Sequence, residues 1–323
     1  MRALVTGGAG YIGSHMVQRL VKDGHHVLVV DDLSTGHRDA VAPHAAFVQA
    51  DVADAGPIAD LLAIHRIDTI LHFAARSVVG ESMTDPRRYY KGNLAATMSL
   101  LDTAIEAGVK VFVQSSTAAV YGDPVSIPID ESHPTCPINP YGDTKLAIER
   151  MLASYGRAYG LAWTALRYFN AAGSDVQAGL GERHPKETHL IPRLIDAALG
   201  HEPPVTLFGT DYDTADGTCV RDYIHVLDLC DAHLRAAQQL ACGATLGPIN
   251  LGTGSGHTVA EVVAVVERVS GRAVPVLTGP RRPGDPTRLV ACADRAAKVL
   301  GWSAQRSDLT RIVRDAWQVR SAS

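Results

Sequence analysis

The first half of the chain alternates between short apolar runs and segments with helical hydrophobic spacing. The runs have the length and composition of buried strands, and they cover residues 2–6, 26–30, 47–50, 68–75, 109–113 and 162–170. The segments between them carry apolar side chains one helical turn apart, at residues 11–21, 58–64, 86–107 and 141–159. This alternation predicts an α/β fold with a Rossmann-type doubly wound parallel sheet.

The regular alternation ends after residue 171. Residues 173–186 are polar and rich in glycine, so we place the change of lobe there. Further strand and helix patterns cover residues 204–209, 220–226, 227–238 and 259–269. We therefore expect a dinucleotide-binding domain over residues 1–172. Residues 173–323 would form mainly a smaller C-terminal α/β lobe, from which the chain can cross back.

Composition and charge narrow the class of protein. The chain has 323 residues, of which 46% are hydrophobic, so it can bury a substantial core. A formal net charge of -4 without a long basic run argues against nucleic acid or an anionic membrane as a partner. No apolar run reaches the ~18 residues needed to cross a bilayer. The N-terminus begins directly with a strand pattern instead of an export signal, so we expect a cytoplasmic protein.

The cysteines and histidines show no metal-binding spacing of the common kinds. The five cysteines are scattered and never form Cys-x-x-Cys, which argues against a disulfide framework or a zinc site. The fourteen histidines form no His-Glu-x-x-His motif. We therefore predict no metal site.

A glycine-rich turn follows the first predicted strand. Gly7, Gly8, Gly10 and Gly13 lead directly into the helical segment 11–21. Such glycines permit a tight turn and let a pyrophosphate approach the backbone N–H groups at a helix start. The pattern alone also fits an ordinary turn between a strand and a helix.

The ends of the next strands favour a dinucleotide. Asp31 and Asp32 follow the second strand, where a carboxylate can accept both ribose hydroxyls and would repel a 2′-phosphate. NAD is therefore favoured over NADP. Asp51 and Val52 follow the third strand and are expected at the adenine edge. The fourth strand ends in small residues, which would let a flat cofactor lie over the sheet edge; its His72 is expected to be a packing residue.

Hydroxyl groups end the fifth predicted strand. Ser115, Ser116 and Thr117 stand at its carboxyl end, where open α/β sheets bind their ligands. The same residues also suit a turn or a helix cap.

Tyr141 and Lys145 form a Tyr-x-x-x-Lys pair in the helical segment 141–159. Their spacing puts the phenol and the ammonium on one helix face, one turn apart. We expect Lys145 to lower the pKa of Tyr141 from about 10 towards working pH, because a nearby cation favours the phenolate. Such a tyrosine can act as a general base for a sugar or alcohol hydroxyl. Alone, this spacing is common on solvated helices.

A basic turn covers residues 280–285 and contains Arg281 and Arg282. Loop arginines usually face solvent. Opposite a cofactor-binding domain, they are suited to hold a diphosphate through bidentate hydrogen bonds.

Together these motifs resemble the extended short-chain dehydrogenase/reductase family and, within it, the UDP-glucose 4-epimerases. The matching strings extend over nearly the whole chain, at residues 6–14, 72–75, 79–82, 139–142, 166–170 and 220–226. The first and the fourth string mark the superfamily. The last two, with the basic turn, are more specific to the epimerases.

The resemblance implies a role for each matching residue. Tyr141 would be the catalytic base, Lys145 would hold the nicotinamide ribose, and Thr117 would bond the reacting sugar oxygen. With Tyr141 and Lys145, NAD would be bound by Gly7, Gly10, Tyr11, Ile12, Gly13, Asp31, Asp32, Asp51, Val52, Phe73, Ala74, Ala75, Asn93, Ser115 and Tyr168. With Thr117 and Tyr141, a UDP-sugar would be bound by Phe169, Asn170, His189, Leu190, Phe208, Arg221, Tyr223, Arg282 and Asp285. The resemblance also implies a homodimer formed through the helices near residues 93–107 and 141–154.

This sequence departs from the family pattern at three positions. Thr117 stands where many epimerases carry serine, and it keeps the hydroxyl. Ser77 stands where some bacterial members carry a lysine near the cofactor phosphates, so one charge contact is missing. Leu289 stands near a position that limits the sugar pocket and is often tyrosine, so an N-acetyl group would have room.

The implied reaction inverts carbon 4 of a UDP-hexose through a 4-keto sugar, and three alternative functions compete with it. A nucleotide-sugar 4,6-dehydratase would carry Thr-Asp-Glu after the fifth strand, but Ala118 and Ala119 follow Thr117 here. A UDP-glucuronate decarboxylase, or a 4-epimerase for uronates or pentoses, shares the cofactor domain and stays open. A non-catalytic NAD-sensing regulator would lose the tyrosine–lysine pair, which is intact.

Overall fold

The computed structural model describes residues 1–282 and 285–322. Pro283 and Gly284, in the predicted basic turn, lie outside the described residues. Within the described part of the chain, every helix is too short or too polar to cross a lipid bilayer.

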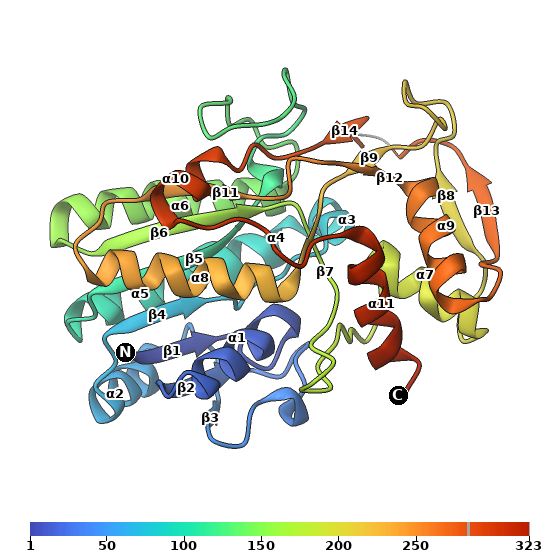
Figure 1. The fold of residues 1–323 in the computed structure, drawn as a ribbon. Helices are drawn as coiled ribbons and strands as arrows, with labels where there is room; N and C mark the ends of the chain where they lie inside the picture. The colour runs from blue at the N-terminus through green and yellow to red at the C-terminus, as the bar shows by residue number, and fades with distance from the viewer. Residues whose placement is uncertain (283–284, 323) are drawn as a thin grey trace.

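A parallel seven-stranded sheet forms the centre of the larger domain (Figure 1). Its spatial order is β11-β6-β5-β4-β1-β2-β3. The strands are β1 Arg2–Thr6, β2 His26–Asp31, β3 Ala46–Gln49, β4 Thr69–His72, β5 Val111–Thr117, β6 Ala162–Tyr168 and β11 Gly247–Leu251. The order reverses between β1 and β4, and open sheets bind ligands at such a switch point. The predicted doubly wound fold is confirmed.

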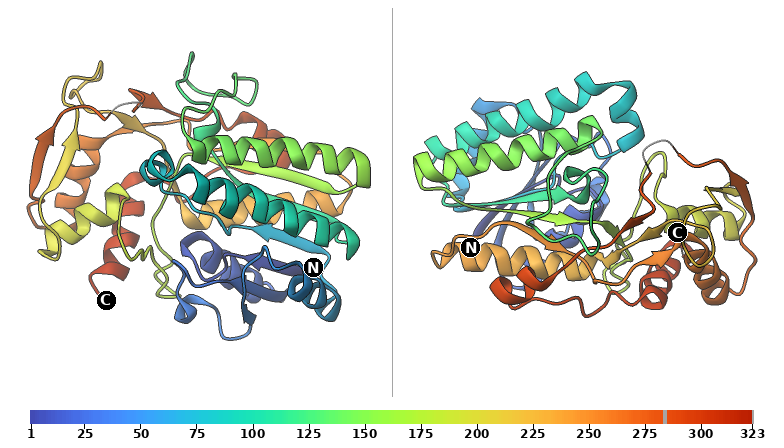
Figure 2. Two further views of the ribbon diagram at one scale, coloured as in Figure 1. Left: turned by 180° about the vertical axis from the view of Figure 1, so that it is seen from behind. Right: turned by 90° about the horizontal axis from the view of Figure 1, so that it is seen from above.

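Helices cover both faces of this sheet (Figure 2). One face carries α1 Tyr11–Lys22, α8 Val226–Ala241 and α10 Asp294–Leu300; the other carries α2 Ala55–His65, α5 Ala96–Glu106 and α6 Pro140–Tyr159. Successive strand side chains point to opposite faces, so Val5 lies in one apolar core and Leu4 in the other. Burial on both faces explains why the strands are continuously apolar.

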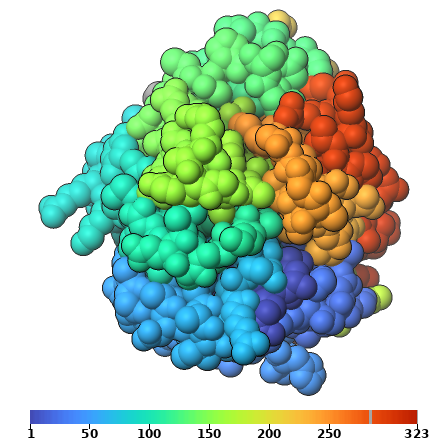
Figure 3. Space-filling view, turned by 90° about the vertical axis from the view of Figure 1, so that its left-hand side faces the viewer, coloured from blue at the N-terminus to red at the C-terminus, as the bar shows by residue number. Residues whose placement is uncertain are grey.

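The second half of the chain returns to this sheet. α8 packs against α1, and β11 extends the sheet beside β6, with α10 packed next to it. Figure 3 shows this return of the chain on one face of the molecule: orange residues, from the later part of the chain, lie between green and blue residues from earlier parts. The larger domain is therefore built from two separate parts of the sequence.

The smaller lobe has its own apolar core. Its larger elements are α7 Leu190–Leu199, β8 Val205–Phe208, α9 Val259–Ser270, β13 Val276–Gly279 and α11 Leu309–Arg320. Short strands form two further sheets: β7 Asn170–Ala172 pairs with β10 Tyr223–His225, and β9 Val220–Arg221 lies between β12 His257–Thr258 and β14 Arg288–Leu289.

The predicted helix over residues 86–107 is wrong as one continuous α-helix. It consists of α4 Pro86–Tyr89, a π-helical segment η2 Tyr90–Ala95, and α5. A π-helical segment inserts extra backbone without changing the apolar spacing clearly enough to be seen in the sequence, and such segments often occur at functional sites. Short α3 Val79–Thr84 precedes them.

Three predicted strands are too long. The run 68–75 ends as a strand at His72, and the small residues that follow form a loop. The run 162–170 divides into β6 and β7, and the run 220–226 divides into β9 and β10. Both runs divide because the chain passes from one sheet to another, which apolar composition does not reveal.

Asp222 ties these crossing segments together. It is fully buried, and its carboxylate accepts hydrogen bonds from the backbone N–H groups of Thr253 (3.0 Å), Gly254 (3.3 Å) and Ala291 (3.2 Å). Burial raises the pKa of this carboxyl, and the hydrogen bonds oppose that rise. One side chain thus holds the segments that follow β11 and β14 against β10.

We expect Asp222→Ala to lower the free energy of unfolding by about 2 kcal/mol or more, because several donors lose their acceptor and the Ala291 N–H is buried. Urea unfolding followed by circular dichroism measures the change. Asp60→Ala is the matched control, since Asp60 is exposed on α2, and it should change stability by less than about 0.5 kcal/mol. Equal urea midpoints for the two variants would contradict the proposed tie.

Candidate active site

The start of α6 is fixed by a close contact. Asn139 caps the helix by accepting a hydrogen bond from the Gly142 N–H (2.8 Å), and Pro140 occupies the first helical position. A Cβ on Gly142 would lie 2.5 Å from the carbonyl oxygen of Ala119. Only glycine therefore lets the helix pack this closely on η3 Ala118–Val120, the turn after β5.

This contact brings together the three predicted catalytic residues. Thr117 ends β5, and its hydroxyl lies close enough to the phenol of Tyr141 to influence the pKa of that phenol. The Nζ of Lys145 lies 5.9 Å from the centre of the Tyr141 ring and donates to the carbonyl oxygen of Ser115 (3.0 Å). A phenol, a hydroxyl and an ammonium group thus meet at the carboxyl end of β5.

The predicted pKa of Tyr141 is wrong for the free protein. Burial raises this pKa to about 12, and the neighbouring Thr117 hydroxyl opposes that rise. Burial also lowers the pKa of Lys145 to about 8, against the attraction of Glu149. The ammonium is directed to a backbone carbonyl, so its attraction for the phenolate does not outweigh the loss of solvation.

A buried ion pair behind Lys145 was missed by sequence reasoning. Glu149, one turn further along α6, accepts hydrogen bonds from Ser116 Oγ (2.6 Å) and Arg167 Nε (3.0 Å). Arg167 also donates to the hydroxyl of Tyr121 (2.9 Å). An acidic residue on the same helix face as Tyr141 and Lys145 was the available signal.

The glycine loop fits a dinucleotide. A Cβ on Gly13 would lie 2.1 Å from the Gly7 carbonyl oxygen, and one on Gly7 would lie 2.5 Å from the Ala74 nitrogen. α1 starts at Tyr11 without a side-chain cap and without an acidic residue in its first turn. Its first N–H groups, which include that of Ile12, are therefore available to a pyrophosphate.

Asp31 lies beside this loop, buried at the end of β2. Its Oδ2 accepts a hydrogen bond from the Ala9 N–H (2.9 Å), and burial raises its pKa. Asp32 is exposed and accepts from the Ser34 N–H (2.8 Å). Asp51 accepts from the Ala53 N–H (2.9 Å), while Val52 packs in the core beneath.

Asn93 positions the loop after β4. Its amide group bonds both backbone groups of Arg76, at 2.8 and 3.0 Å, and lies 3.3 Å from Thr144 Oγ1. Phe73, Ala74 and Ala75 belong to the loop held in this way, and each is half-buried. Asn93 is thus linked to the predicted cofactor residues indirectly, because it holds the loop that contains them.

Aromatic hydroxyls complete the cofactor side. The Tyr168 hydroxyl is hydrogen-bonded to Ser115 Oγ at the sheet edge. The Tyr11 hydroxyl donates to the carbonyl oxygen of Gly173 (2.6 Å), which joins the glycine loop to the segment that leads into the second lobe. His72 bonds Thr6 (2.6 Å) and Thr97 (2.9 Å) in the interior, and burial lowers its pKa to about 3, as expected for a packing residue.

The predicted UDP contacts gather on the smaller lobe. α7 begins at Leu190 without a side-chain cap and without an acidic residue in its first turn, so it can accept an anion. Arg221 is ion-paired with Asp285, and both Asp285 and Arg282 line a surface cavity. The guanidinium of Arg282 lies 4.1 Å from the centre of the Phe208 ring.

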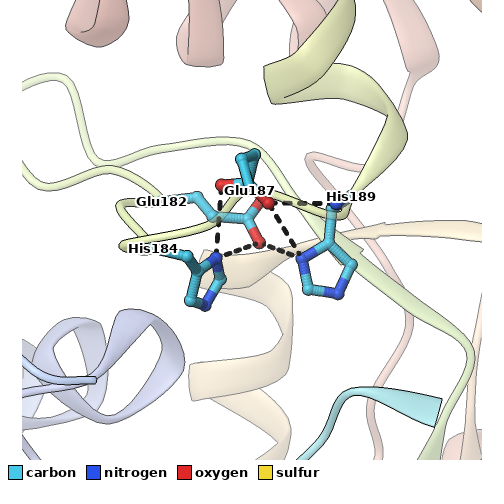
Figure 4. A group of neighbouring side chains, drawn as sticks. All are labelled: Glu182, His184, Glu187 and His189. Carbon is cyan, nitrogen blue, oxygen red and sulfur yellow. Dashed lines mark hydrogen bonds and ion pairs between the residues drawn. The ribbon is translucent and has the colours of Figure 1, made fainter. Parts of the chain in front are cut away.

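The remaining predicted substrate residues differ in their surroundings. Asn170 donates from its side-chain amide to the Asp222 carbonyl oxygen (3.1 Å). Tyr223 is only 6% exposed and packs in the core of the smaller lobe. The His189 side chain faces Glu182, with 2.6 Å between Nδ1 and Oε1 (Figure 4). Phe169 and Leu289 pack against the same apolar cluster, which contains Ala118 next to Thr117.

Comparison with known proteins identifies the family of this chain. Residues 3–252 match the model of the NAD dependent epimerase/dehydratase family. The chain is 48% identical to a UDP-glucose 4-epimerase from Halalkalibacterium halodurans, over 98% of this chain and 95% of that protein.

Two solved structures have the same fold. The UDP-glucose 4-epimerase from Brucella ovis in complex with NAD is 46% identical, with a TM-score of 0.95 over 98% of this chain and 97% of that one. The UDP-Glc/GlcNAc 4-epimerase from Campylobacter jejuni is 38% identical, with a TM-score of 0.87 over 99% of both chains. The chain belongs to the NAD dependent epimerase/dehydratase family.

Proposed function

We propose that this protein is a UDP-glucose 4-epimerase that interconverts UDP-glucose and UDP-galactose with bound NAD. The observation that carries the proposal is the meeting of Thr117, Tyr141 and Lys145 at the end of β5. The sugar range and the individual residue roles below are parts of the same proposal.

Tyr141, Thr117 and Lys145 have different roles in the proposed reaction. Bound NAD supplies hydride-transfer chemistry at carbon 4 of the hexose. Tyr141 takes the proton from the 4-hydroxyl and later returns it, while Thr117 orients the same oxygen. Lys145 holds the nicotinamide ribose and keeps a positive charge near the phenol. The pKa of Tyr141 in the free protein, about 12, means that the bound cofactor and substrate must favour the phenolate.

Inversion requires that the 4-keto sugar can present its other face. The diphosphate and the uridine must therefore supply the affinity, through the start of α7, Arg221 and Arg282. Phe169 and Leu289 offer the sugar an apolar border that fixes no orientation. Tight nucleotide binding with loose sugar binding follows from this division.

We also infer a homodimer formed through α5 and α6. Met83, Tyr90 and Met98 leave 40% or more of their surface exposed along the neighbouring segments α3 to α5. Such residues gain from burial against a second copy.

Tyr141→Phe should reduce kcat by about 10²-fold or more, since general-base catalysis is lost. NAD content per chain should stay unchanged, because the ring keeps its packing. Turnover of UDP-galactose and the absorbance of released NAD measure the two quantities. Tyr159→Phe, at an exposed tyrosine on the same helix, should match the native enzyme. Unchanged turnover in Tyr141→Phe would remove this residue as the base.

Lys145→Met should alter how stability depends on pH. The pKa of Lys145 is about 8 in the folded state and near 10.4 when unfolded, so unfolding takes up a proton between these values and the native protein gains stability as pH rises. The advantage of Lys145→Met over the NAD-free native protein should therefore shrink between pH 7 and 10. Urea titrations at each pH measure it. Exposed Lys110→Met should show no such trend, and the same flat result for Lys145→Met would refute the lowered pKa.

We propose that the sugar pocket also admits UDP-N-acetylhexosamines, because Leu289 is smaller than the tyrosine often found near this position. Leu289→Tyr should lower kcat/KM for UDP-N-acetylglucosamine by about tenfold or more and leave UDP-glucose within about threefold. Product stereochemistry read by NMR checks both substrates. Rejection of UDP-N-acetylglucosamine by the native enzyme would end this part of the proposal without affecting the reaction itself.

A further inference from the structure

The side chain of Tyr89 packs against the predicted catalytic base. Tyr89 ends α4 and is fully buried. Its ring centre lies 6.5 Å from that of Tyr141, and the two ring planes meet at 81°. Aromatic pairs favour this edge-to-face arrangement because the edge of a ring is positive and its face is negative. Tyr141 itself is half-buried, so Tyr89 covers part of its surface and leaves another part accessible.

The hydroxyl of Tyr89 fixes the other end of its ring. It lies 2.6 Å from the carbonyl oxygen of Val78 and 2.8 Å from Oε2 of Glu81, at the start of α3. Burial and the nearby Glu81 carboxylate raise the pKa of Tyr89, so this hydroxyl keeps its proton and acts as a donor. Glu81 is held in turn by an ion pair with Arg88. The ring therefore cannot turn away from Tyr141 without losing these contacts.

The π-helical segment η2 continues this contact along α6. The Tyr90 hydroxyl donates to Oδ2 of Asp143 (2.6 Å). The Asn93 amide donates to Thr144 Oγ1 (3.3 Å), and that hydroxyl donates to the carbonyl oxygen of Tyr141 (2.8 Å). Successive residues of a regular α-helix point about 100° apart, yet Tyr90 and the tyrosine before it both contact α6, where the π-helical segment begins. The first turn of α6 is thus supported at three positions.

The chemistry of a general base explains why this support matters. Tyr141 must release and recover a proton at the same place, and a displacement of about 1 Å can cost about 10²-fold in rate. The ring of Tyr89 adds no charge to the site, but it takes the place of water beside the phenol. We propose that Tyr89 is a positioning residue for Tyr141: its ring orients the phenol and keeps water from one side of it. The inference rests on the proposed function, in which Tyr141 is the base.

The ionisable groups near the phenol and its support come from four elements: Lys145 and Asp143 of α6, Tyr168 of β6, Tyr89 of α4 and Glu81 of α3. Burial is the main reason why the pKa of Tyr141 is raised to about 12. A smaller side chain at position 89 would admit water and lower this pKa, while the other groups stay in place. The phenolate would then form at lower pH.

Tyr89→Leu tests the proposal. We expect kcat for UDP-galactose to fall by about tenfold or more, because the phenol loses its orientation. The acid limb of the pH profile of kcat should move to lower pH by about half a unit or more. Tyr89→Phe keeps the ring and should stay within about threefold of the native kcat, with an unshifted profile. Ile58→Ala, in the buried core beside α2, should lower the free energy of unfolding without shifting the profile.

Fluorine NMR of protein labelled with 3-fluorotyrosine gives a second readout that needs no turnover. The Tyr141 resonance is identified by its loss in Tyr141→Phe, and its shift between H₂O and D₂O reports contact with water. We expect this solvent shift to increase in Tyr89→Leu. Tyr89→Met, which also removes the ring but fills the space better, takes its place if Tyr89→Leu does not fold.

The two readouts separate the possible outcomes. An unchanged solvent shift, or an unchanged kcat and pH profile in a folded variant without the ring, overturns the role of Tyr89. Inactivity of the native protein towards UDP-hexoses would instead contradict the proposed function, and the fluorine measurement would still decide whether Tyr89 shields the phenol.

Discussion

The buried charges along one face of α6 are the constraint on which the site depends. Tyr141, Lys145 and Glu149 follow at intervals of one turn, and Lys145 is only 2% exposed. An unpaired ammonium there would be very costly. The Ser115 carbonyl oxygen on β5 and the carboxylate of Glu149 offset that cost, and Arg167 on β6 balances Glu149 in turn. Buried polar contacts thereby hold α6 against both β5 and β6.

Local chemistry explains what the sequence could predict. The glycine turn before α1 and the start of α6 are each decided by a few neighbouring residues, and each lies within one residue of the expected position. The grouping of Tyr141 with Lys145 needs only the helical repeat. Thr117 could be placed because parallel strands bring their carboxyl ends to one edge.

The features that sequence analysis missed depend on partners far along the chain. The pKa of Tyr141 is set by how deeply the phenol is buried, which spacing alone does not reveal. The structural role of Asp222 depends on hydrogen bonds from the backbone N–H groups of residues 253, 254 and 291, which are distant from it in the sequence. The π-helical segment contains Asn93, whose side chain accepts a hydrogen bond from the backbone N–H of Arg76, and the sequence does not reveal this contact.

Two helix starts share a property that relates to the chemistry between them. α1 and α7 both begin without a side-chain cap and without an acidic residue in the first turn, so both leave N–H groups for an anion. One belongs to the cofactor side and the other to the predicted diphosphate side. The residues near Thr117 are different in kind, because Phe169 and Leu289 present apolar surface there. Most of the binding affinity can then come from contacts with the charged diphosphate groups of the cofactor and the substrate. The sugar between them is left to contact a few groups that matter mainly in the transition state, which is the arrangement that a reaction with a turning intermediate requires.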